Sequence, residues 1–333
     1  LRRQRQMCIR DSSDEASSNS DYGKPGMFGA DLNASYYTIE QPYTLMYTTA
    51  SQASYIIETA PSVDFSGNEE LRNAYMGEAY FWRAFAHYYL LINFRNISPI
   101  RQMPRNGDDY VRPLEKPAAV WDFIQEDLAH AKELLPVKGY WDSKNAGRVT
   151  KASAAALLGK AYLYRSGIEQ YYGEDKTTFY SEAAKEFGDV IDGKYGTYDL
   201  TKNYADNFDV AHENNEESIL EFQFLGDVDN AGFNPGLATS GLAFDSRGLM
   251  LPGAGVGYEG VVHNWLYNAF VNSVDKDGYT DIRMFSTMIF NDLDASIHLR
   301  NDAGGNPVRL EGPGGYKWEE LYPAKNGKEG FAT

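Results

Sequence analysis

Leu71 to Phe94 reads LRNAYMGEAYFWRAFAHYYLLINF, and the expected architecture follows from this segment. Its apolar residues fall on most of the circumference of a helix rather than on a single stripe. A helix of that kind is buried on more than one side. We therefore expect a central helix, with Trp82 in the core and His87 packed and hydrogen-bonded within it.

Several further segments have apolar residues at helical spacing, and residues typical of helix ends flank them. Pro42 suits the first turn of a helix that ends before Pro61, and Thr150 suits the N-cap of another. Trp121 lies on the apolar face of the helix expected at about residues 117–135, and we assign it to the core. Besides the central helix, the expected helices span about residues 42–60, 117–135, 151–167, 178–191 and 261–272.

Two of these helices resemble a tetratricopeptide pair. Leu158 and Gly159, followed by Tyr162, match its first helix, in which a small residue lets the paired helix approach closely. Ala183 and Phe187 fall at the spacing of its second helix, after an insertion that holds GIEQYYGEDK. Such pairs stack, and each buries a face that its neighbour supplies. We therefore predict a mainly α fold with a tetratricopeptide-like helical hairpin scaffold.

The composition changes after about Leu200. Stretches rich in Gly, Asn and Asp predict a loop-rich second half with short strands, one of them at ESILEFQF, where residues alternate in polarity. Residues 1–30 begin with LRRQRQMCIRDS and continue with few apolar groups, so they read as a foreign or disordered tail. The expected regions are 1–30 for the tail, 31–200 for the helical scaffold and 201–333 for a loop-rich ligand-binding region that is truncated at its C-terminal end.

The charge and cysteine content exclude several classes of protein. A formal net charge of −16 disfavours binding to a nucleic-acid backbone, which needs a basic face. The single cysteine, Cys8, excludes an internal disulfide framework and a cysteine-based zinc cluster. No apolar run is long enough to span a bilayer as a helix. The 25 Tyr, 17 Phe and 5 Trp supply rings for packing and for stacking on flat ligand faces.

The segment GAGVGYEG places Gly255, Gly257 and Gly260 in a G-x-G-x-x-G pattern. A dinucleotide loop of this pattern needs a buried strand before it and a βαβ unit around it. The preceding SRGLMLP is short and contains Pro252, so we expect a loop that presents a ligand or a Gly-rich surface turn.

Two acidic segments imitate calcium loops. DVDNAG has Asp227, Asp229 and Gly232 at EF-hand positions, but Ala238 stands where the bidentate Glu belongs. DKDGYTD has its glycine too early in the loop. Neither segment predicts an EF-hand, and no metal site is expected.

The sequence carries no strong catalytic signature. The five histidines are far apart and form no H-x-x-x-H pair, and no G-x-S-x-G elbow is present. Paired carboxylates for glycoside hydrolysis are set by the fold and not by sequence spacing. A helical glycoside hydrolase therefore stays open as an alternative, as does a tetratricopeptide scaffold that binds peptides on its concave helix face.

Five blocks in order resemble the SusD/RagB family, the surface lipoproteins of Bacteroidetes that capture glycans for uptake. The family's first hallmark helix is similar to GEAYFWRAFAHYYLLINF, and its third is similar to GRVTKASAAALLGKAYLY. VWDFIQEDLAHAKELLP, NNEESILEFQF and LYNAFVNSVDKDGYTDIRMFSTMI resemble the other blocks, the last with a D-x-R turn. The resemblance covers roughly residues 31–325.

The resemblance implies a non-enzymatic protein that binds oligosaccharides at the extracellular face of the outer membrane. It also implies docking on a SusC-like TonB-dependent transporter, without a cofactor, for polysaccharide utilisation. Two departures are present. Cys8 follows RQM rather than a lipobox, so we expect no lipid anchor within this chain. We also expect the chain to be a fragment that lacks the family's usual C-terminal helical segment.

In such binders, rings stack on the apolar faces of sugars and polar side chains fix the hydroxyl groups. The family's Gly-rich loop commonly carries such a ring, and Tyr258 holds that position here, with Asn264 and Trp265 close behind. Burial against the scaffold is the competing interpretation for Trp265, because it shares a helix face with Ala269. The remaining candidates are Tyr36 and Tyr37, before the first helix, and Trp318.

Overall fold

The computed structural model describes residues 16–18, 37–107, 111–173, 175–208, 212–223, 259–262, 264–281 and 283–287. The chain divides into two compact units. The scaffold unit consists of Glu40–Leu200 and Glu216–Glu221. The second unit consists of Leu1–Ile39, Thr201–Asn215 and Phe222–Thr333.

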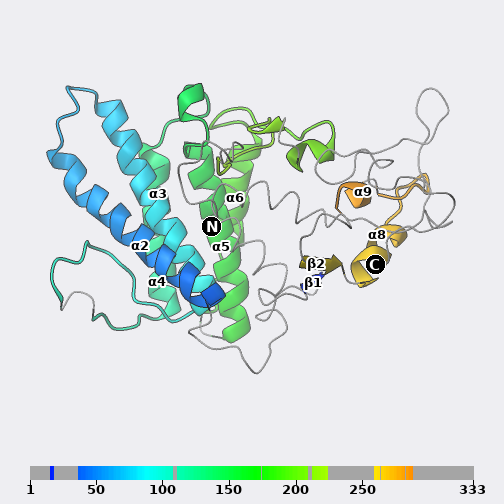
Figure 1. Cartoon of the computed structure of the whole chain (residues 1–333), viewed down its shortest axis with the longest axis horizontal. Helices are drawn as coiled ribbons and strands as arrows, with labels where there is room; N and C mark the ends of the chain where they lie inside the picture. The colour runs from blue at the N-terminus through cyan, green and yellow to red at the C-terminus, as the bar shows by residue number, and fades with distance from the viewer. Residues whose placement is uncertain are drawn as a thin grey trace. The chain divides into compact units, whose positions relative to one another are not determined.

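Helices form most of the scaffold unit, and the mainly α fold is confirmed (Figure 1). α3 packs against α4, α4 against α5, and α5 against α6. Consecutive helices therefore form the stacked hairpins that the sequence predicts. The scaffold helices are α2 (Tyr37–Thr59), α3 (Glu69–Phe94), α4 (Pro117–Leu134), α5 (Lys151–Tyr172) and α6 (Tyr180–Ile191).

The expected start of the first long helix is wrong. α2 begins at Tyr37, so Pro42 lies inside the helix and not in its first turn. A proline inside a helix lacks the N–H for one backbone hydrogen bond, and tertiary contacts offset that loss here. The Ser54 hydroxyl donates to the carbonyl of Ile100 at 3.2 Å, and the Tyr47 hydroxyl accepts from the N–H of Ser98 at 3.1 Å.

α3 is the central helix predicted from Leu71–Phe94. The Asn68 side chain caps its first turn by accepting from the N–H of Leu71 at 3.0 Å. His87 is completely buried: its Nδ1 lies 2.8 Å from the carbonyl of Arg83, and its Nε2 accepts from the N–H of Ile100 at 2.9 Å. Trp121 of α4 is also completely buried, as expected, whereas Trp82 is only partly buried.

The α5–α6 pair has the close approach that a tetratricopeptide-like hairpin needs. A Cβ on Gly159 would lie 2.8 Å from Cε1 of Phe187, so glycine is the residue that lets α6 pack here. A capping box begins α5, with the N–H of Thr150 donating to the Ser153 hydroxyl at 3.1 Å. α5 ends at Gly173, whose φ is +70°, and it therefore includes much of the expected insertion.

The strand expected at ESILEFQF is not formed between Glu217 and Gln223, and Phe224 lies outside the described residues. The carbonyl of Ile219 accepts from the Ser153 hydroxyl at 2.9 Å, and the Ile219 side chain packs against a buried cluster that includes Val190 and Tyr195. Contacts with α5 and α6 thus replace strand pairing.

The described part of the second unit contains short elements. β1 (Ala16–Ser18) pairs antiparallel with β2 (Glu259–Val262), and these two strands make the sheet found among the described residues. α8 (Asn264–Asn272) and α9 (Arg283–Thr287) follow. The helix expected to begin at about residue 261 begins at Asn264 instead, because residues 261 and 262 belong to β2. No helix in the described residues has the length and apolar character needed to cross a bilayer.

Candidate functional site

The structure describes only part of the predicted glycan site. Tyr258, Tyr36 and Trp318 lie outside the described residues. Asn264 and Trp265 are the first two residues of α8. Tyr37 is the first residue of α2, and its side chain is not described.

Asn264 is exposed, and 46% of the Trp265 side chain is exposed. A partly exposed indole beside an exposed amide combines a flat apolar face with hydrogen-bonding groups. Asn264 and Trp265 therefore stay predicted sugar contacts, and the structure places them together at the start of α8.

The segment after α8 forms a turn. Oδ1 of Asp275 accepts from the N–H groups of Asp277 and Tyr279, at 2.8 and 3.1 Å. The D-x-R turn follows, with Oδ1 of Asp281 accepting from the N–H of Arg283 at 3.0 Å, and the Arg283 guanidinium lowers the pKa of Asp281. These carboxylates shape the backbone, and no group of three His, Cys, Asp or Glu in the described residues is placed to hold a metal.

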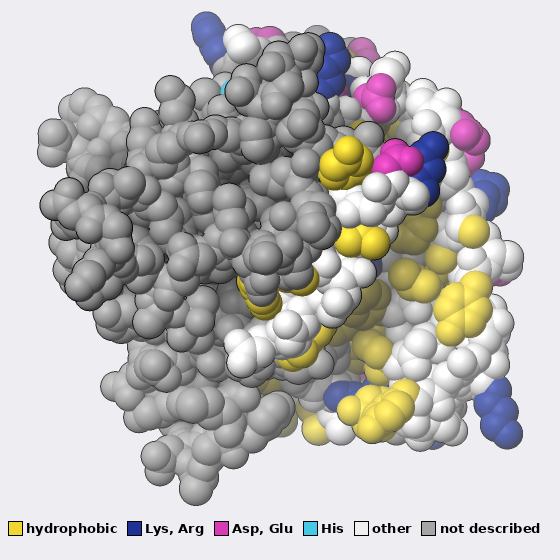
Figure 2. Space-filling view, turned by 90° about the vertical axis from the view of Figure 1, so that its right-hand side faces the viewer, with side chains coloured by type: hydrophobic (Ala, Val, Ile, Leu, Met, Phe, Trp, Pro, Cys, Tyr) yellow, Lys and Arg dark blue, Asp and Glu magenta, His cyan; other side chains and the backbone are white. Residues whose placement is uncertain are grey.

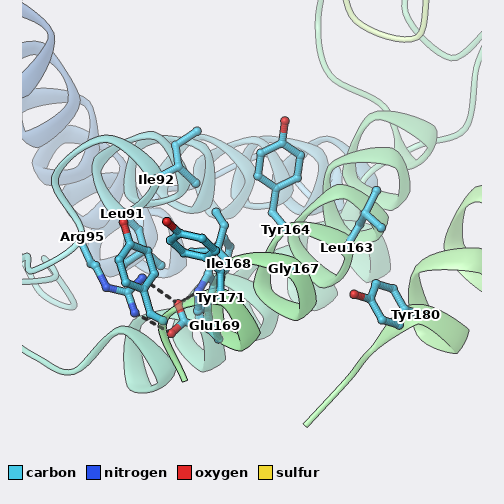
Figure 3. A pocket seen from close by; sticks show the side chains of 12 residues that line it. Leu91, Ile92, Arg95, Leu163, Tyr164, Gly167, Ile168, Glu169, Tyr171 and Tyr180 are labelled. Carbon is cyan, nitrogen blue, oxygen red and sulfur yellow. Dashed lines mark hydrogen bonds and ion pairs between the residues drawn. The ribbon is translucent and has the colours of Figure 1, made fainter. Parts of the chain in front are cut away.

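A cavity of about 550 Å³ opens on the scaffold unit between the C-terminal end of α3 and the C-terminal half of α5 (Figure 3). Its volume falls in the range of roughly 300–1,000 Å³ that is usual for small-ligand sites. It is lined mainly by apolar and aromatic side chains. The lining residues are Leu91, Ile92, Arg95, Trp121, Leu163, Tyr164, Gly167, Ile168, Glu169, Tyr171, Tyr172 and Tyr180.

Four tyrosines give the cavity its aromatic character. Tyr164, Tyr171 and Tyr172 come from α5, and Tyr180 begins α6. Their side chains are between 39% and 84% exposed. Hydrophobic side chains also reach the described surface at several other places on the face drawn in Figure 2. Scattered apolar groups of that kind are normal, so the grouping of rings around a cavity is the distinguishing feature.

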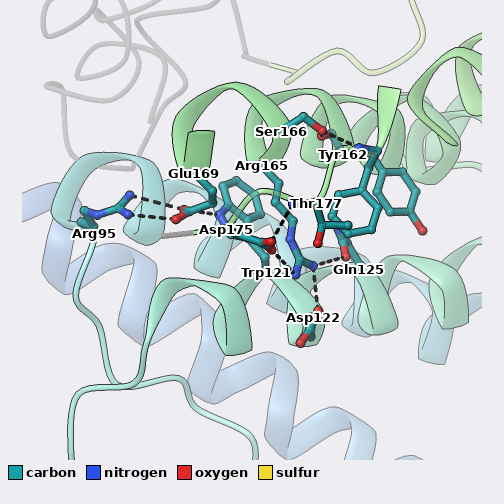
Figure 4. A network of polar contacts seen from close by, with 11 residues as sticks. Arg95, Trp121, Asp122, Gln125, Tyr162, Arg165, Ser166, Glu169, Asp175 and Thr177 are labelled. Atoms are coloured by element: carbon teal, nitrogen blue, oxygen red, sulfur yellow. Dashed lines mark hydrogen bonds and ion pairs between the residues drawn. The ribbon is translucent and has the colours of Figure 1, made fainter. Parts of the chain in front are cut away.

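A buried carboxylate lies at the floor of the cavity. Glu169 is 1% exposed and accepts from Nη1 and Nη2 of Arg95, at 3.3 and 2.9 Å, and from Nε1 of Trp121, at 2.9 Å (Figure 4). The Arg95 guanidinium also lies 3.9 Å from the centre of the Tyr172 ring. These contacts connect α3, α4 and α5 and neutralise the charge of Glu169.

A second arginine organises the neighbouring part of α5. Arg165 donates to Asp122 at 2.7 Å and to Gln125 at 2.8 Å, and it pairs with Asp175 at 3.3 Å. The hydrogen bond from the N–H of Thr177 is the main cause of the lowered pKa of Asp175, with Arg165 adding to it. A carboxyl held ionised in this way is poorly suited to act as the proton donor of a glycoside hydrolase.

Sequence reasoning missed this cavity. Tyr171 and Tyr172 fall in the segment that was expected to be an insertion after the helix. The signal was present, because Tyr164, Ile168 and Tyr171 share one face if the helix is continued. The expected helix ends at Gly167, whereas the glycine with a positive φ, which terminates α5, is Gly173.

Comparisons with known proteins agree with the resemblance. Residues 3–163 match a SusD-like family model described as starch-binding and associating with the outer membrane. A SusD-like protein from Bacteroides ovatus is 29% identical over 180 residues, covering 54% of this chain and 32% of that protein. This chain therefore spans about a third of the length of that relative.

Solved structures show the same fold. A SusD superfamily protein from Bacteroides vulgatus superimposes with a TM-score of 0.67 at 21% identity, covering 96% of this chain and 60% of that one. A laminarin-binding SusD-like protein gives a TM-score of 0.56 at 25% identity, covering 67% of this chain and 46% of that one.

Proposed function

Because residues 3–163 match a SusD-like family model, we propose that the chain captures oligosaccharides at the cell surface and releases them unchanged. The family match over residues 3–163 is the observation that carries this proposal. The laminarin-binding relative adds support for a glycan ligand.

The proposed contacts are non-covalent. The half-exposed ring of Trp265 stacks on the apolar face of a sugar, and the exposed amide of Asn264 hydrogen-bonds to its hydroxyl groups. Tyr258 supplies a second ring from the Gly-rich loop, and Tyr36, Tyr37 and Trp318 remain further candidates. Binding of this kind uses shape and hydrogen bonds and requires no cofactor.

The resemblance extends the proposal to partners and location. We infer that the full protein acts at the extracellular face of the outer membrane, attached by a lipid anchor, and delivers its ligand to a SusC-like TonB-dependent transporter. Co-purification of the tagged protein with such a transporter tests this step separately from glycan binding.

Two activities compete with glycan capture. A helical glycoside hydrolase needs two carboxylates that face one cleft, whereas Glu169 and Asp175 are each engaged by an arginine. A peptide-binding scaffold would use the helices and would not depend on Tyr258 or Trp265.

A glycan array combined with a reducing-end assay separates these possibilities. Glycan capture predicts that the purified chain binds a subset of glycans and releases no reducing ends from them. Tyr258→Ala should weaken that binding. Tyr55→Ala, which removes a 54% exposed ring from α2, is the matched control and should bind as the wild type does. Release of reducing ends, or the absence of any glycan binding, would contradict the proposal.

A further inference from the structure

We propose that the cavity between α3 and α5 is a second binding site, which takes a neutral oligosaccharide on the scaffold unit. The inference rests on the proposed function, since it assigns a further glycan site to a glycan-binding protein. The cavity shares no residue with the glycan contacts predicted in the second unit, because every residue that lines it belongs to the scaffold unit.

The rings of the cavity are arranged for contact with a ligand. Tyr171 and Tyr172 meet edge to face, with ring centroids 5.1 Å apart and an interplanar angle of 87°. Tyr164 meets the buried Tyr88 in the same manner, at 5.8 Å and 64°. An edge-to-face contact engages only part of each ring, and the exposure of Tyr164 and Tyr171 leaves ring surface for stacking.

The same tyrosines supply hydrogen-bonding groups. Among the described residues, the hydroxyls of Tyr164, Tyr171, Tyr172 and Tyr180 make no hydrogen bond to protein. Each hydroxyl donates one hydrogen bond and accepts others. Rings with available hydroxyls match a sugar, which presents C–H faces and hydroxyl groups together. A purely apolar ligand would leave these hydroxyls without partners when it covers them.

The charge of the cavity favours a neutral ligand. Glu169 is compensated by Arg95 and Trp121, and Arg95 is engaged by Glu169 and the Tyr172 ring. Lys160 lies 5.5 Å from the centre of the Tyr164 ring, outside the residues that line the cavity. An anionic or cationic ligand would therefore displace existing partners, whereas a neutral sugar would not.

The size of the cavity and its rigid floor argue for a small ligand. The cavity volume of about 550 Å³ falls in the usual range for small-ligand sites and suits a short oligosaccharide. A protein partner would need a much broader contact surface, of about 800 Å² on each side. The contacts of Glu169 with Arg95 and Trp121 fix the ends of three helices, so ligand binding needs little reorganisation.

Isothermal titration of the purified chain with laminari-, xylogluco- and malto-oligosaccharides tests the inference. The key variant is Tyr171→Ala, because an 84% exposed ring can be removed without disturbing the fold. Tyr164→Ala removes another ring that lines the cavity, Trp265→Ala alters the second unit, and Tyr55→Ala is the control. Hydrogen exchange of residues 163–172 with and without sugar reports where the ligand binds.

The inference predicts that Tyr171→Ala and Tyr164→Ala each weaken binding at one class of site roughly three- to tenfold. It also predicts that sugar slows exchange in 163–172, in wild type and in Trp265→Ala alike. Wild-type sugar binding that is unaffected by both tyrosine variants, with no protection of 163–172, overturns the second site and leaves the proposed function intact. Absence of binding of every tested sugar by the wild type overturns both.

Discussion

Arg83 of α3 and Asp127 of α4 form a buried bidentate ion pair. Nε of Arg83 lies 2.7 Å from Oδ2 of Asp127, and Nη2 lies 2.8 Å from Oδ1. The two side chains are only 8% and 2% exposed. Arg83 also donates to the carbonyl of Arg101 at 2.9 Å, so one guanidinium connects two helices and the segment that follows α3.

Removing one partner of this pair should destabilise the scaffold strongly. Asp127→Ala leaves the Arg83 charge buried without its carboxylate, which typically costs about 3–5 kcal/mol of unfolding free energy. Urea unfolding followed by tryptophan fluorescence measures the loss. Glu126→Ala, at an exposed position of the same helix, is the control and should change stability by less than about 1 kcal/mol. Equal losses in the two variants would show that the pair is not a main support of α3 and α4.

The contact of Gly159 with Phe187 predicts a position-specific effect of alanine. Gly159→Ala should cost about 1–3 kcal/mol, because the new methyl group would overlap the Phe187 ring. Gly188→Ala, in α6 with nothing within 4 Å of the added Cβ, should be neutral or stabilise by up to about 1 kcal/mol. Phe187→Leu should recover part of the loss in the Gly159→Ala background. Equal changes in stability for the two glycine variants would show that the close approach of α6 does not require a glycine at position 159.

His87 predicts a loss of stability in acid. Burial, together with the nearby charges of Arg83 and Arg101, lowers its pKa to about 3, although its hydrogen bond to the Arg83 carbonyl acts in the opposite direction. Between the unfolded pKa of about 6.5 and the folded value, the unfolded state binds the proton and the folded state does not. His87 should therefore reduce the unfolding free energy by about 1.4 kcal/mol for each pH unit below 6.5. Burial raises the pKa of the neighbouring Asp127, which favours the folded state as that carboxyl is protonated, so its contribution has the opposite sign.

Unfolding free energies of the wild type and His87→Gln, measured from pH 7 to pH 4, check this contribution. The variant should be less stable at neutral pH and should have the shallower slope in acid. His130→Gln, at an exposed position, is the comparison variant. A His87→Gln slope identical to that of the wild type would contradict the prediction.

Trp121 predicts a cost for losing one hydrogen bond to a buried carboxylate. Trp121→Phe keeps an aromatic ring in the core but removes the Nε1 donor to Glu169. Glu169 retains Arg95, so the expected loss is about 1–3 kcal/mol from the missing bond and the smaller ring. Thermal unfolding by circular dichroism measures it, with the partly buried Trp82→Phe as the matched variant. A smaller loss at Trp121 than at Trp82 would contradict the assigned role of the hydrogen bond.

The sequence predicts the scaffold well because helical periodicity is a local signal. The burial of α3, the cap at Thr150 and the close approach at Gly159 all follow from residue spacing and size. The prediction of a strand around Ile219 was wrong, because an alternating pattern does not require strand pairing. Here the Ile219 side chain packs against the helical core, and its carbonyl accepts from the Ser153 hydroxyl. Tertiary contacts decided that segment, and no local pattern contains them.

The candidate sites were less predictable than the scaffold. The exposure of Trp265 could not be separated from burial, because the spacing from Trp265 to Ala269 fits both. The α3–α5 cavity depends on where α5 ends and on the pairing of Glu169 with Arg95, residues far apart in the sequence. Tyr258, Tyr36 and Trp318 remain predictions from the family resemblance.

Affinity electrophoresis of the native chain through gels that contain laminarin, xyloglucan or starch tests the central claim most directly. Glycan capture predicts that at least one polysaccharide retards the wild type, and that Trp265→Ala migrates faster than the wild type in that gel while Tyr55→Ala does not. Unretarded migration of the wild type in every gel, or equal retardation of the wild type and Trp265→Ala, would contradict the account of a sugar-binding surface at the start of α8.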